Sequence, residues 1–241
     1  MSPRLAPARL APVTPAALGT ALGGQVPPAG ARIGLLGGSF NPAHDGHLEI
    51  SQEALRRLGL DRVWWLVSPQ NPLKSRDGMA PMAERLAAAR RVAADRRIVV
   101  TGLEAVLGTA YTADTLQALA RLLPRVRFVW LMGADNLIQV HHWQDWQQIF
   151  NTVAVAVFDR PSYAFKALSG RAALSFARYR LDEGSARRLA EERAPAWVFM
   201  RCRLNPQSAT DIRAASDRRS LGGEQDAAAT GSAGRANRKE T

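Results

Sequence analysis

Two histidines three residues apart, His44 and His47, have the residue type and spacing that most directly suggest chemistry. They belong to the segment GGSFNPAHDGH, which runs from residue 37 to residue 47. If a helix begins here, residues three apart lie on the same side of it, so both imidazoles can face one ligand. An imidazole N–H can donate to negative charge that develops on a phosphoryl oxygen. The pair therefore predicts a phosphate site, whereas one histidine alone would more simply be a polar surface or core residue.

The elements that must position these histidines are a strand and a helix. The apolar pattern predicts a first strand over residues 32–36 and a helix over residues 46–58. A helix N-terminus carries partial positive charge and free N–H groups, which attract anionic oxygens. Gly37 and Gly38 have no side chain, so we expect the backbone there to approach a phosphate closely. The segment matches neither the GxxxxGK[ST] nor the GxGxxG phosphate loop.

Short apolar runs alternate with helical patterns along the rest of the chain, which is typical of βαβ units. Further strands are expected at residues 63–67, 98–101, 126–132, 153–158 and 197–202, and further helices at 81–94, 112–123 and 185–192. The sequence thus predicts an α/β fold: a doubly wound, Rossmann-like, mostly parallel sheet of five to six strands with helices on both faces. In such folds ligands bind beyond the carboxyl ends of the strands.

The two ends of the chain differ in composition from the middle. Residues 1–30 are rich in Ala, Pro and Gly, and residues 216–241 in Gly, Ala, Ser and charged residues. Both lack apolar periodicity, so we expect a disordered leader and a disordered tail. Residues 31–215 are then one folded domain, which suits a chain of 241 residues.

Composition narrows the setting and the partners. Hydrophobic residues make up 46% and charged residues 22% of the chain, and no apolar run is long enough to span a membrane. A single cysteine, Cys202, predicts no internal disulfide and favours a reducing cytoplasm. The formal charge of +11 would suit nucleic acid, but the arginines are scattered without interleaved aromatic residues. We expect a small polyphosphate ligand, with neither a nucleic acid nor a membrane as partner.

The segment at residues 37–47 resembles the HxGH signature of the nucleotidylyltransferase superfamily. Its extended form, GG(S/T)F(D/N)PxHxGH, resembles bacterial nicotinate-nucleotide adenylyltransferases, with Asn41 where many members carry Asp. The resemblance implies transfer of the AMP moiety of ATP to nicotinic acid mononucleotide, with release of pyrophosphate, in NAD biosynthesis. It implies direct in-line attack without a covalent enzyme intermediate. The ATP contacts that it implies in this segment are Gly37, Gly38, Ser39, Phe40, His44 and His47.

A second match lies near the end of the chain, where residues 208–213 resemble the family's ISSTxIR motif. Arg213 could grip phosphoryl oxygens through its planar fork, and Ser208 and Thr210 could donate hydroxyls. Gln207 and Ala209 depart from the motif, and S-x-T alone would be only a helix cap. The resemblance implies that Ser208, Thr210 and Arg213 bind ATP, and that Arg213 acts with the two histidines in catalysis.

Segments in the middle of the chain point to the second substrate. Gly133 and Asp135 resemble a family turn in which the carboxylate takes ribose hydroxyls, which implies that both residues bind ATP and that Asp135 also binds the acceptor. Alternatively, this Asp could simply cap a helix. Trp143 matches the aromatic residue that stacks on the pyridine ring, with core packing as the alternative; Trp146 fits the core better. Thr112, from a YTxDT segment, is implied near the nicotinate, or merely begins a helix. Lys74 is implied at the acceptor phosphate, or is a solvated loop lysine.

Mg²⁺ is the implied cofactor, bridging ATP phosphates and held mainly by substrate and water, since the sequence shows no dedicated metal cage.

Three rival functions remain open. Another adenylyl or cytidylyl transferase of the superfamily, such as one using phosphopantetheine, would share the histidine segment. A catalytically silent nucleotide-binding module and a nucleic-acid binder are the others. A homo-oligomer is compatible with the sequence, which leaves the oligomeric state open.

Overall fold

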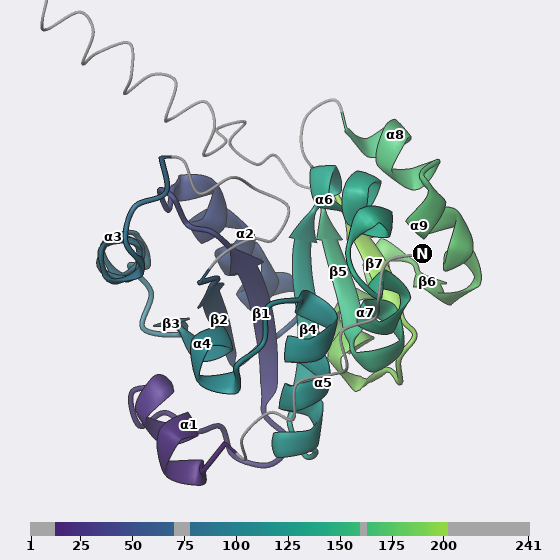
Figure 1. Cartoon of the computed structure of the whole chain (residues 1–241). Coiled ribbons are helices and arrows are strands. Elements are labelled where there is room, and N and C mark those ends of the chain that lie inside the picture. The colour runs from purple at the N-terminus through teal and green to yellow at the C-terminus, as the bar shows by residue number, and fades with distance from the viewer. Residues whose placement is uncertain (1–12, 70–77, 160–162, 202–241) are drawn as a thin grey trace, which may run out of the picture.

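The computed structural model describes residues 13–69, 78–159 and 163–201. Its strands are β1 (Arg32–Gly38), β2 (Arg62–Val67), β3 (Ile98–Thr101), β4 (Arg127–Gly133), β5 (Ala154–Phe158), β6 (Arg180–Leu181) and β7 (Trp197–Met200). In the described residues they form one seven-stranded sheet in the order β3-β2-β1-β4-β5-β7-β6 (Figure 1). Every pairing is parallel. This confirms the predicted α/β doubly wound fold, with more strands than the five to six expected.

Helices connect the strands. The α-helices are α1 (Pro15–Ala21), α2 (Asp45–Arg57), α3 (Met82–Val92), α4 (Leu103–Leu107), α5 (Thr112–Leu122), α6 (Ala134–Gln139), α7 (Trp146–Thr152), α8 (Ala164–Leu168) and α9 (Arg171–Ser175). The 3₁₀ helices are η1 (Val140–His142), η2 (Ala177–Tyr179) and η3 (Glu183–Glu191). None of the described helices is both long and apolar enough to cross a membrane.

Side chains alternate between the two faces of the sheet, so each strand contributes to two cores. Leu35 packs with the face covered by α1 and α4 to α7, and Leu36 with the face covered by α2, α3 and η3. In Figure 1, α2 passes behind the sheet, whereas α4, α5 and α7 lie in front of it. The central strands are apolar on both faces, as expected of a parallel sheet buried by helices on each side.

The strand order reverses next to β1. From β1 the chain adds β2 and β3 on one side, then returns to place β4 on the other side. Leu36 of β1 pairs with Leu131 of β4, so the carboxyl ends of these two strands lie at the same edge. The helices that follow them, α2 and α6, lie on opposite faces of the sheet. In α/β folds this is the position beyond the strand ends where ligands bind.

Several elements differ from the sequence prediction. The additional strand, β6, has only two residues, too few for an alternating pattern to be recognised. Helices α4, α6, α7, α8 and α9 were not predicted; each has five to seven residues, which is less than two full turns. The helix expected at 185–192 is the 3₁₀ helix η3.

The expectation of a disordered leader over residues 1–30 is wrong for its described part. Helix α1 begins after Thr14, whose hydroxyl accepts from the backbone N–H of Ala17 at 3.2 Å. Leu18 and Leu22 are buried in the core, and the Thr101 hydroxyl donates to the carbonyl of Ala21 at 2.7 Å. Two leucines were enough to dock this short helix, although its Ala and Pro content concealed the apolar face. Residues 1–12 and the expected tail, 216–241, lie outside the described residues.

Candidate active site

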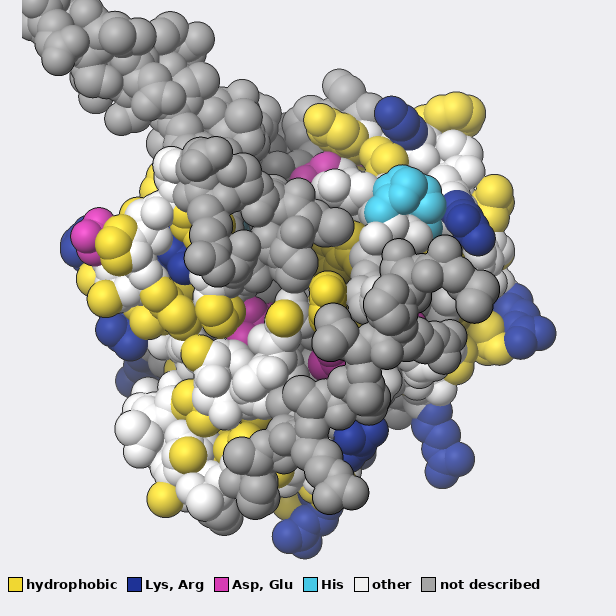
Figure 2. Space-filling model, viewed as in Figure 1, with side chains coloured by type: hydrophobic (Ala, Val, Ile, Leu, Met, Phe, Trp, Pro, Cys, Tyr) yellow, Lys and Arg dark blue, Asp and Glu magenta, His cyan; other side chains and the backbone are white. Residues whose placement is uncertain are grey.

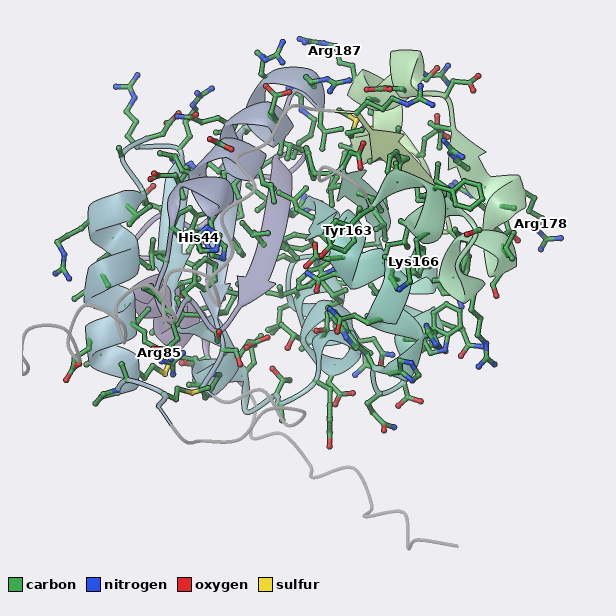
Figure 3. The ribbon with its side chains drawn as sticks, turned by 90° about the horizontal axis from the view of Figure 1, so that it is seen from above. His44, Arg85, Tyr163, Lys166, Arg178 and Arg187 are labelled. Carbon is green, nitrogen blue, oxygen red and sulfur yellow. The ribbon has the colours of Figure 1, made fainter. Side chains whose placement is uncertain are left out.

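Helix α2 carries both histidines to the carboxyl end of β1. His44 is the residue that precedes its first turn, and His47 lies within that turn. Asp45 in the first turn and Arg56 and Arg57 in the last turn complement the helix dipole. His44 is buried, and the two imidazole ring centres are 3.8 Å apart. The predicted pairing of the imidazoles is therefore present in the structure, and Figure 3 shows His44 between the ribbons rather than at the rim.

A backbone contact fixes the hydrogen-bonding state of His47. The N–H of His44 donates to Nδ1 of His47 at 3.2 Å, and the N–H of His47 donates to the carbonyl of His44 at 2.9 Å. Because Nδ1 accepts a hydrogen bond, the neutral imidazole of His47 carries its proton on Nε2. His47 can thus present Nε2–H as a donor to an anionic ligand.

Two buried hydrogen bonds connect the backbone of His47 to the side chain of Trp65 on β2. The hydroxyl of Ser51 donates to the carbonyl of His47 at 2.7 Å and accepts from the indole N–H of Trp65 at 2.8 Å. Both Ser51 and Trp65 are fully buried. The first turn of α2 is therefore tied to β2 by polar contacts as well as by packing.

Phe40 holds the turn between β1 and α2 in an uncommon conformation. Its φ of 48° lies in the left-handed region, which a bulky non-glycine residue adopts only when its surroundings compensate. The buried ring stacks on Trp65 with centroids 5.1 Å apart and also contacts the ring of His47 at 4.6 Å. Phe40 thus shapes the turn and packs against a catalytic candidate.

Packing gives Gly37 a second reason, besides the close approach to a phosphate that the sequence predicts. A Cβ at Gly37 would lie 2.4 Å from Cη2 of Trp130 on β4, a distance that real structures do not tolerate. Gly37 therefore makes room for a core tryptophan. At Gly38 the nearest neighbour of an added Cβ would be the ring of Phe40 at 3.4 Å, which is close to an ordinary van der Waals contact. Packing therefore does not require glycine at this position.

Asn41, which stands where many family members carry Asp, uses both ends of its amide. The side-chain NH₂ donates to the carbonyl of Gly78 at 3.0 Å, and the amide oxygen accepts from the N–H of Ala80 at 3.3 Å. An ionised Asp can only accept hydrogen bonds, so it could make the second contact but not the first. The departure from the family pattern therefore suits the backbone that precedes α3.

Arg85 on α3 is a functional candidate that the sequence reasoning missed. Its guanidinium donates to four backbone carbonyls, those of Ala80 at 2.9 Å, Ser39 at 2.7 Å, Ser68 at 2.8 Å and Pro69 at 3.2 Å. The residue is buried, and burial lowers the pKa of the guanidinium. In Figure 3 it lies between the ribbons, whereas Arg178 and Arg187 point outward. Arg85 therefore joins the turn that follows β1, the loop that follows β2 and the start of α3.

Gly133 and Asp135 lie at the carboxyl end of β4, next to the end of β1. Gly133 closes the strand, and Asp135 is in the first turn of α6. Asp135 is half-buried, with one carboxylate oxygen removed from solvent. The topology thus places the segment of residues 37–47 and the turn at Gly133 and Asp135 on either side of the point where the strand order reverses.

The two acceptor candidates come from elements that pack together. Thr112 begins α5 and is half-buried, and Trp143 precedes α7, where it packs partly against the core. Helices α5 and α7 are in contact, and the carboxylates of Asp114 and Asp145, near the starts of these helices, are close enough to repel. Burial first, and then the charge of Asp145, raises the pKa of Asp114. The starts of both helices are therefore neighbours, as acceptor binding by Thr112 and Trp143 requires.

The neighbouring tryptophan, Trp146, has the structural role that the sequence suggested. It is buried and meets the rings of Phe150 and Phe176 edge-on, at centroid distances of 6.3 and 5.9 Å. The remaining predicted site residues, Lys74, Ser208, Thr210 and Arg213, lie outside the described residues.

Glu104 is a second residue that sequence reasoning missed. It lies on α4, is 7% exposed, and burial raises its pKa to about 7 against a weaker opposing hydrogen bond from Thr115. One signal was available, because this carboxylate interrupts an otherwise apolar run from Leu103 to Leu107. A charged residue within such a run is seldom buried without a partner.

Surface charge shows no continuous basic path in the view of Figure 2. The Lys and Arg side chains of the described residues, drawn in dark blue, are scattered along the rim of this face. Across residues 13–69, 78–159 and 163–201, no group of three or more His, Cys, Asp or Glu side chains could hold a metal ion.

Comparison with known proteins shows the family of the chain. The cytidylyltransferase-like family model matches residues 35–215. A probable nicotinate-nucleotide adenylyltransferase of Bradyrhizobium sp. (strain ORS 278) is 57% identical over 182 residues, covering 76% of this chain and 95% of the relative. One from Parvibaculum lavamentivorans is 55% identical over 184 residues, covering 76% and 92%.

A solved structure shares the fold at much lower identity. The nicotinic acid mononucleotide adenylyltransferase of Plasmodium falciparum, complexed with NaAD, superposes with a TM-score of 0.57 at 16% identity, over 76% of this chain and 82% of that one. Helix α1 lies before residue 35, where the family match begins. The chain belongs to the cytidylyltransferase-like family and, within it, to the nicotinate-nucleotide adenylyltransferases.

Proposed function

We propose that this chain transfers the AMP moiety of ATP to nicotinic acid mononucleotide, forming nicotinic acid adenine dinucleotide and pyrophosphate, through the site at the ends of β1 and β4. One observation carries the assignment of the site. The paired imidazoles of His44 and His47 lie at the start of a helix, at the edge where the strand order reverses. This is where a parallel sheet binds nucleotides, and paired N–H donors suit the phosphates.

The reaction is a direct displacement at phosphorus. An oxygen of the acceptor phosphate attacks the α-phosphorus of ATP, and the bond from that phosphorus to the bridging oxygen breaks. The bonding electrons leave with pyrophosphate, so no protein nucleophile is required. Charge builds on the non-bridging oxygens and on the leaving group, where fixed donors stabilise it. We assign this role to Nε2–H of His47 and to His44, assisted by Arg213.

The two substrates are assigned to different sides of the crevice. The turn formed by Gly37, Gly38, Ser39 and Phe40 binds ATP phosphates, and Gly133 with Asp135 binds the ribose hydroxyls. Ser208 and Thr210 are assigned to ATP from the family resemblance. The nicotinate ring stacks on Trp143 and meets donors near Thr112, while Lys74 is assigned to the acceptor phosphate. The contact between α5 and α7 supports the joint role of Thr112 and Trp143.

Mg²⁺ is proposed to enter with ATP. Its preferred ligands are oxygens, and it keeps several waters, so the ATP phosphates can hold it without a protein cage. The donor set of the described residues fits this mode, because Asp135 is a single carboxylate near the ATP side. When bound, the ion neutralises charge on the phosphates. We further propose that the enzyme works in the cytoplasm on small molecules, without a nucleic-acid or membrane partner.

The decisive assay incubates the purified full chain with ATP and Mg²⁺ and one candidate acceptor at a time, and follows both pyrophosphate and the dinucleotide. We expect nicotinic acid mononucleotide to exceed nicotinamide mononucleotide by roughly tenfold or more in kcat/KM, because hydrogen bonds to a charged carboxylate are worth about 1.5–3 kcal/mol. Phosphopantetheine should give no product. Preference for phosphopantetheine would move the chain to another activity of the superfamily, and release of no pyrophosphate would leave a silent binding module.

A further inference from the structure

A buried polar cluster lies behind the segment that we assign to the acceptor. The cluster consists of Glu104 on α4, Thr109 in the following loop and Thr115 on α5, and all three residues are buried. The hydroxyl of Thr115 lies 3.4 Å from Oε1 of Glu104, 2.8 Å from the hydroxyl of Thr109 and 3.2 Å from the carbonyl oxygen of Tyr111. None of these three residues belongs to the predicted site, yet their contacts end on the backbone next to Thr112.

The carbonyl of Tyr111 is the link to the acceptor segment. Tyr111 is the residue that precedes α5, and its carbonyl accepts both the backbone N–H and the hydroxyl of Thr115. The N–H of Thr109 in turn donates to the carbonyl of Glu104 at 3.1 Å. Both ends of the loop between α4 and α5 are therefore tied to the same cluster, and with them the position of Thr112.

The protonation state of Glu104 decides how many hydrogen bonds the cluster can form at once. Thr115 has one hydroxyl proton, which can go either to the carbonyl of Tyr111 or to an ionised Glu104, but not to both. A protonated Glu104 can donate to Thr115, and Thr115 can then give its own proton to Tyr111. The remaining lone pair of the Thr115 oxygen can accept from Thr109. Only the protonated carboxyl therefore allows all three contacts to be hydrogen bonds at once.

We propose that Glu104 is a positioning residue for the acceptor: its neutral carboxyl completes the cluster that fixes residues 111 and 112, and its ionisation loosens this segment and weakens acceptor binding. The inference rests on the proposed function, because it takes Thr112 as part of the acceptor site. Glu104 itself contacts no substrate. Its effect should therefore appear in the affinity for nicotinic acid mononucleotide and not in that for ATP.

The surroundings of Glu104 favour the neutral form at pH values below about 7. Burial raises the pKa of this carboxyl to about 7, and the hydrogen bond from Thr115 acts in the opposite direction. The elements that pack most closely against α4 in the described residues are α1, β2 and α5. Helix α1 has no titratable side chain, and β2 has only Arg62, which bonds to Gln25. On α5, Asp114 and Arg121 are the charged residues, and Arg121 bonds to Gln117. Within the described residues, no ion pair holds Glu104 ionised.

The first test is the variant Glu104→Gln, whose amide stays neutral and can donate to Thr115 at every pH. KM for nicotinic acid mononucleotide, KM for ATP and kcat are measured from pH 6 to pH 8.5. In the unmodified chain the acceptor KM should rise over this range by about three- to tenfold relative to Glu104→Gln, the size expected for one hydrogen bond. The ratio between the two proteins removes the titration of the substrate phosphate and of the histidines, which both proteins share.

Glu84→Gln is the matched control, because it is the same substitution at an exposed position on α3. It should keep the pH profile of the unmodified chain. Thr115→Val, which removes the shared hydroxyl, should raise the acceptor KM already at pH 6 and leave the KM for ATP unchanged. If Glu104→Gln keeps the same rise in acceptor KM as the unmodified chain, or if ATP and the acceptor change together, the inference is wrong.

A second test needs no variant. The side-chain carboxyl carbon of Glu104 is followed by ¹³C NMR during a pH titration of the labelled full chain, with no ligand, with nicotinic acid mononucleotide and with ATP. Linkage is reciprocal, so an acceptor that binds the neutral form better must raise the pKa of Glu104. We expect the midpoint to move up with the acceptor and to stay in place with ATP.

The outcomes separate the two proposals. An acceptor that binds but leaves the midpoint unchanged would overturn the role of Glu104 and leave the enzymatic function intact. Nicotinic acid mononucleotide that neither binds nor reacts would overturn the proposed function, whatever the titration of the free protein shows.

Discussion

The backbone N–H of His44 donates to Nδ1 of His47 at 3.2 Å, so one catalytic candidate fixes the tautomer of the other. The contact leaves Nε2 of His47 as its donor and holds the two imidazoles with centroids 3.8 Å apart. A second proton on Nδ1 of His47 would break this bond. This contact at the start of α2 therefore requires an unprotonated Nδ1 on His47.

We predict that His47→Ala lowers kcat by about two to three orders of magnitude, the range for the loss of one charge-stabilising donor. His47→Gln can place an amide N–H near the position of Nε2, whereas the shorter His47→Asn mimics only the Nδ1 side. Steady-state pyrophosphate release should thus rank Gln above Asn, with circular dichroism as the check on folding. Equal activity of Asn and Gln would contradict the assignment of Nε2–H.

Arg85→Lys tests the junction of the three segments near the ATP turn. A lysine ammonium has three donors on a flexible stem and cannot reproduce the planar fork that reaches four carbonyls. We expect a loss of about 2–3 kcal/mol in the free energy of unfolding, measured in urea, and a higher KM for ATP because the Ser39 carbonyl is released. Arg90→Lys, at an exposed position on the same helix, is the control and should change neither quantity.

Leu22→Ala tests whether α1 is part of the folded domain. Leu22 is fully buried in the core, so we expect a loss of about 2–4 kcal/mol in the free energy of unfolding. Val26→Ala, at a residue that is 47% exposed, should cost far less. Equal effects of the two substitutions would show that α1 does not dock in solution.

Deletion of the residues after about 224 should leave both melting temperature and activity unchanged, as their composition predicts.

The stability of the protein should fall as pH rises through the pKa of Glu104. The folded value, about 7, lies above the ordinary value of 4.5, so the contribution of this group is fully present below pH 4.5 and lost as pH rises to about 7. This increase in the pKa of Glu104 corresponds to a difference of about 3 kcal/mol in the free energy of unfolding between low and high pH. Chemical denaturation from pH 4.5 to pH 8, compared with Glu104→Gln, should reveal the difference. Parallel curves for the two proteins would contradict it.

Trp143→Ala should weaken the use of either pyridine mononucleotide while sparing ATP. Loss of a stacked ring removes about 0.5–1.5 kcal/mol beyond area burial, or roughly two- to tenfold in acceptor KM. Trp143→Phe keeps an aromatic face and should recover most of the affinity. An unchanged acceptor KM for the alanine variant would return Trp143 to a purely structural role.

Local patterns in the sequence determined the sheet and the chemical type of the site. The alternation of apolar strands with helices, and two histidines three apart at a helix start, depend on neighbours in the chain, so they can be recognised without the fold. The residues 37–47 thus predicted the turn between β1 and α2 that carries the paired histidines, and the apolar run at 126–132 predicted a central strand. The short elements, such as β6 and α4, carried too few residues for either period to show.

Contacts between distant segments were decided only by the tertiary structure. Gly37 is needed because Trp130 packs over it, and Arg85 is buried because carbonyls from three separate segments converge on it. Burial among α1, β2 and α5 raises the pKa of Glu104, and α1 joins the core because Leu18 and Leu22 pack on a surface formed by later strands. Burial and pKa depend on what surrounds a residue in space, which the order of residues along the chain does not reveal.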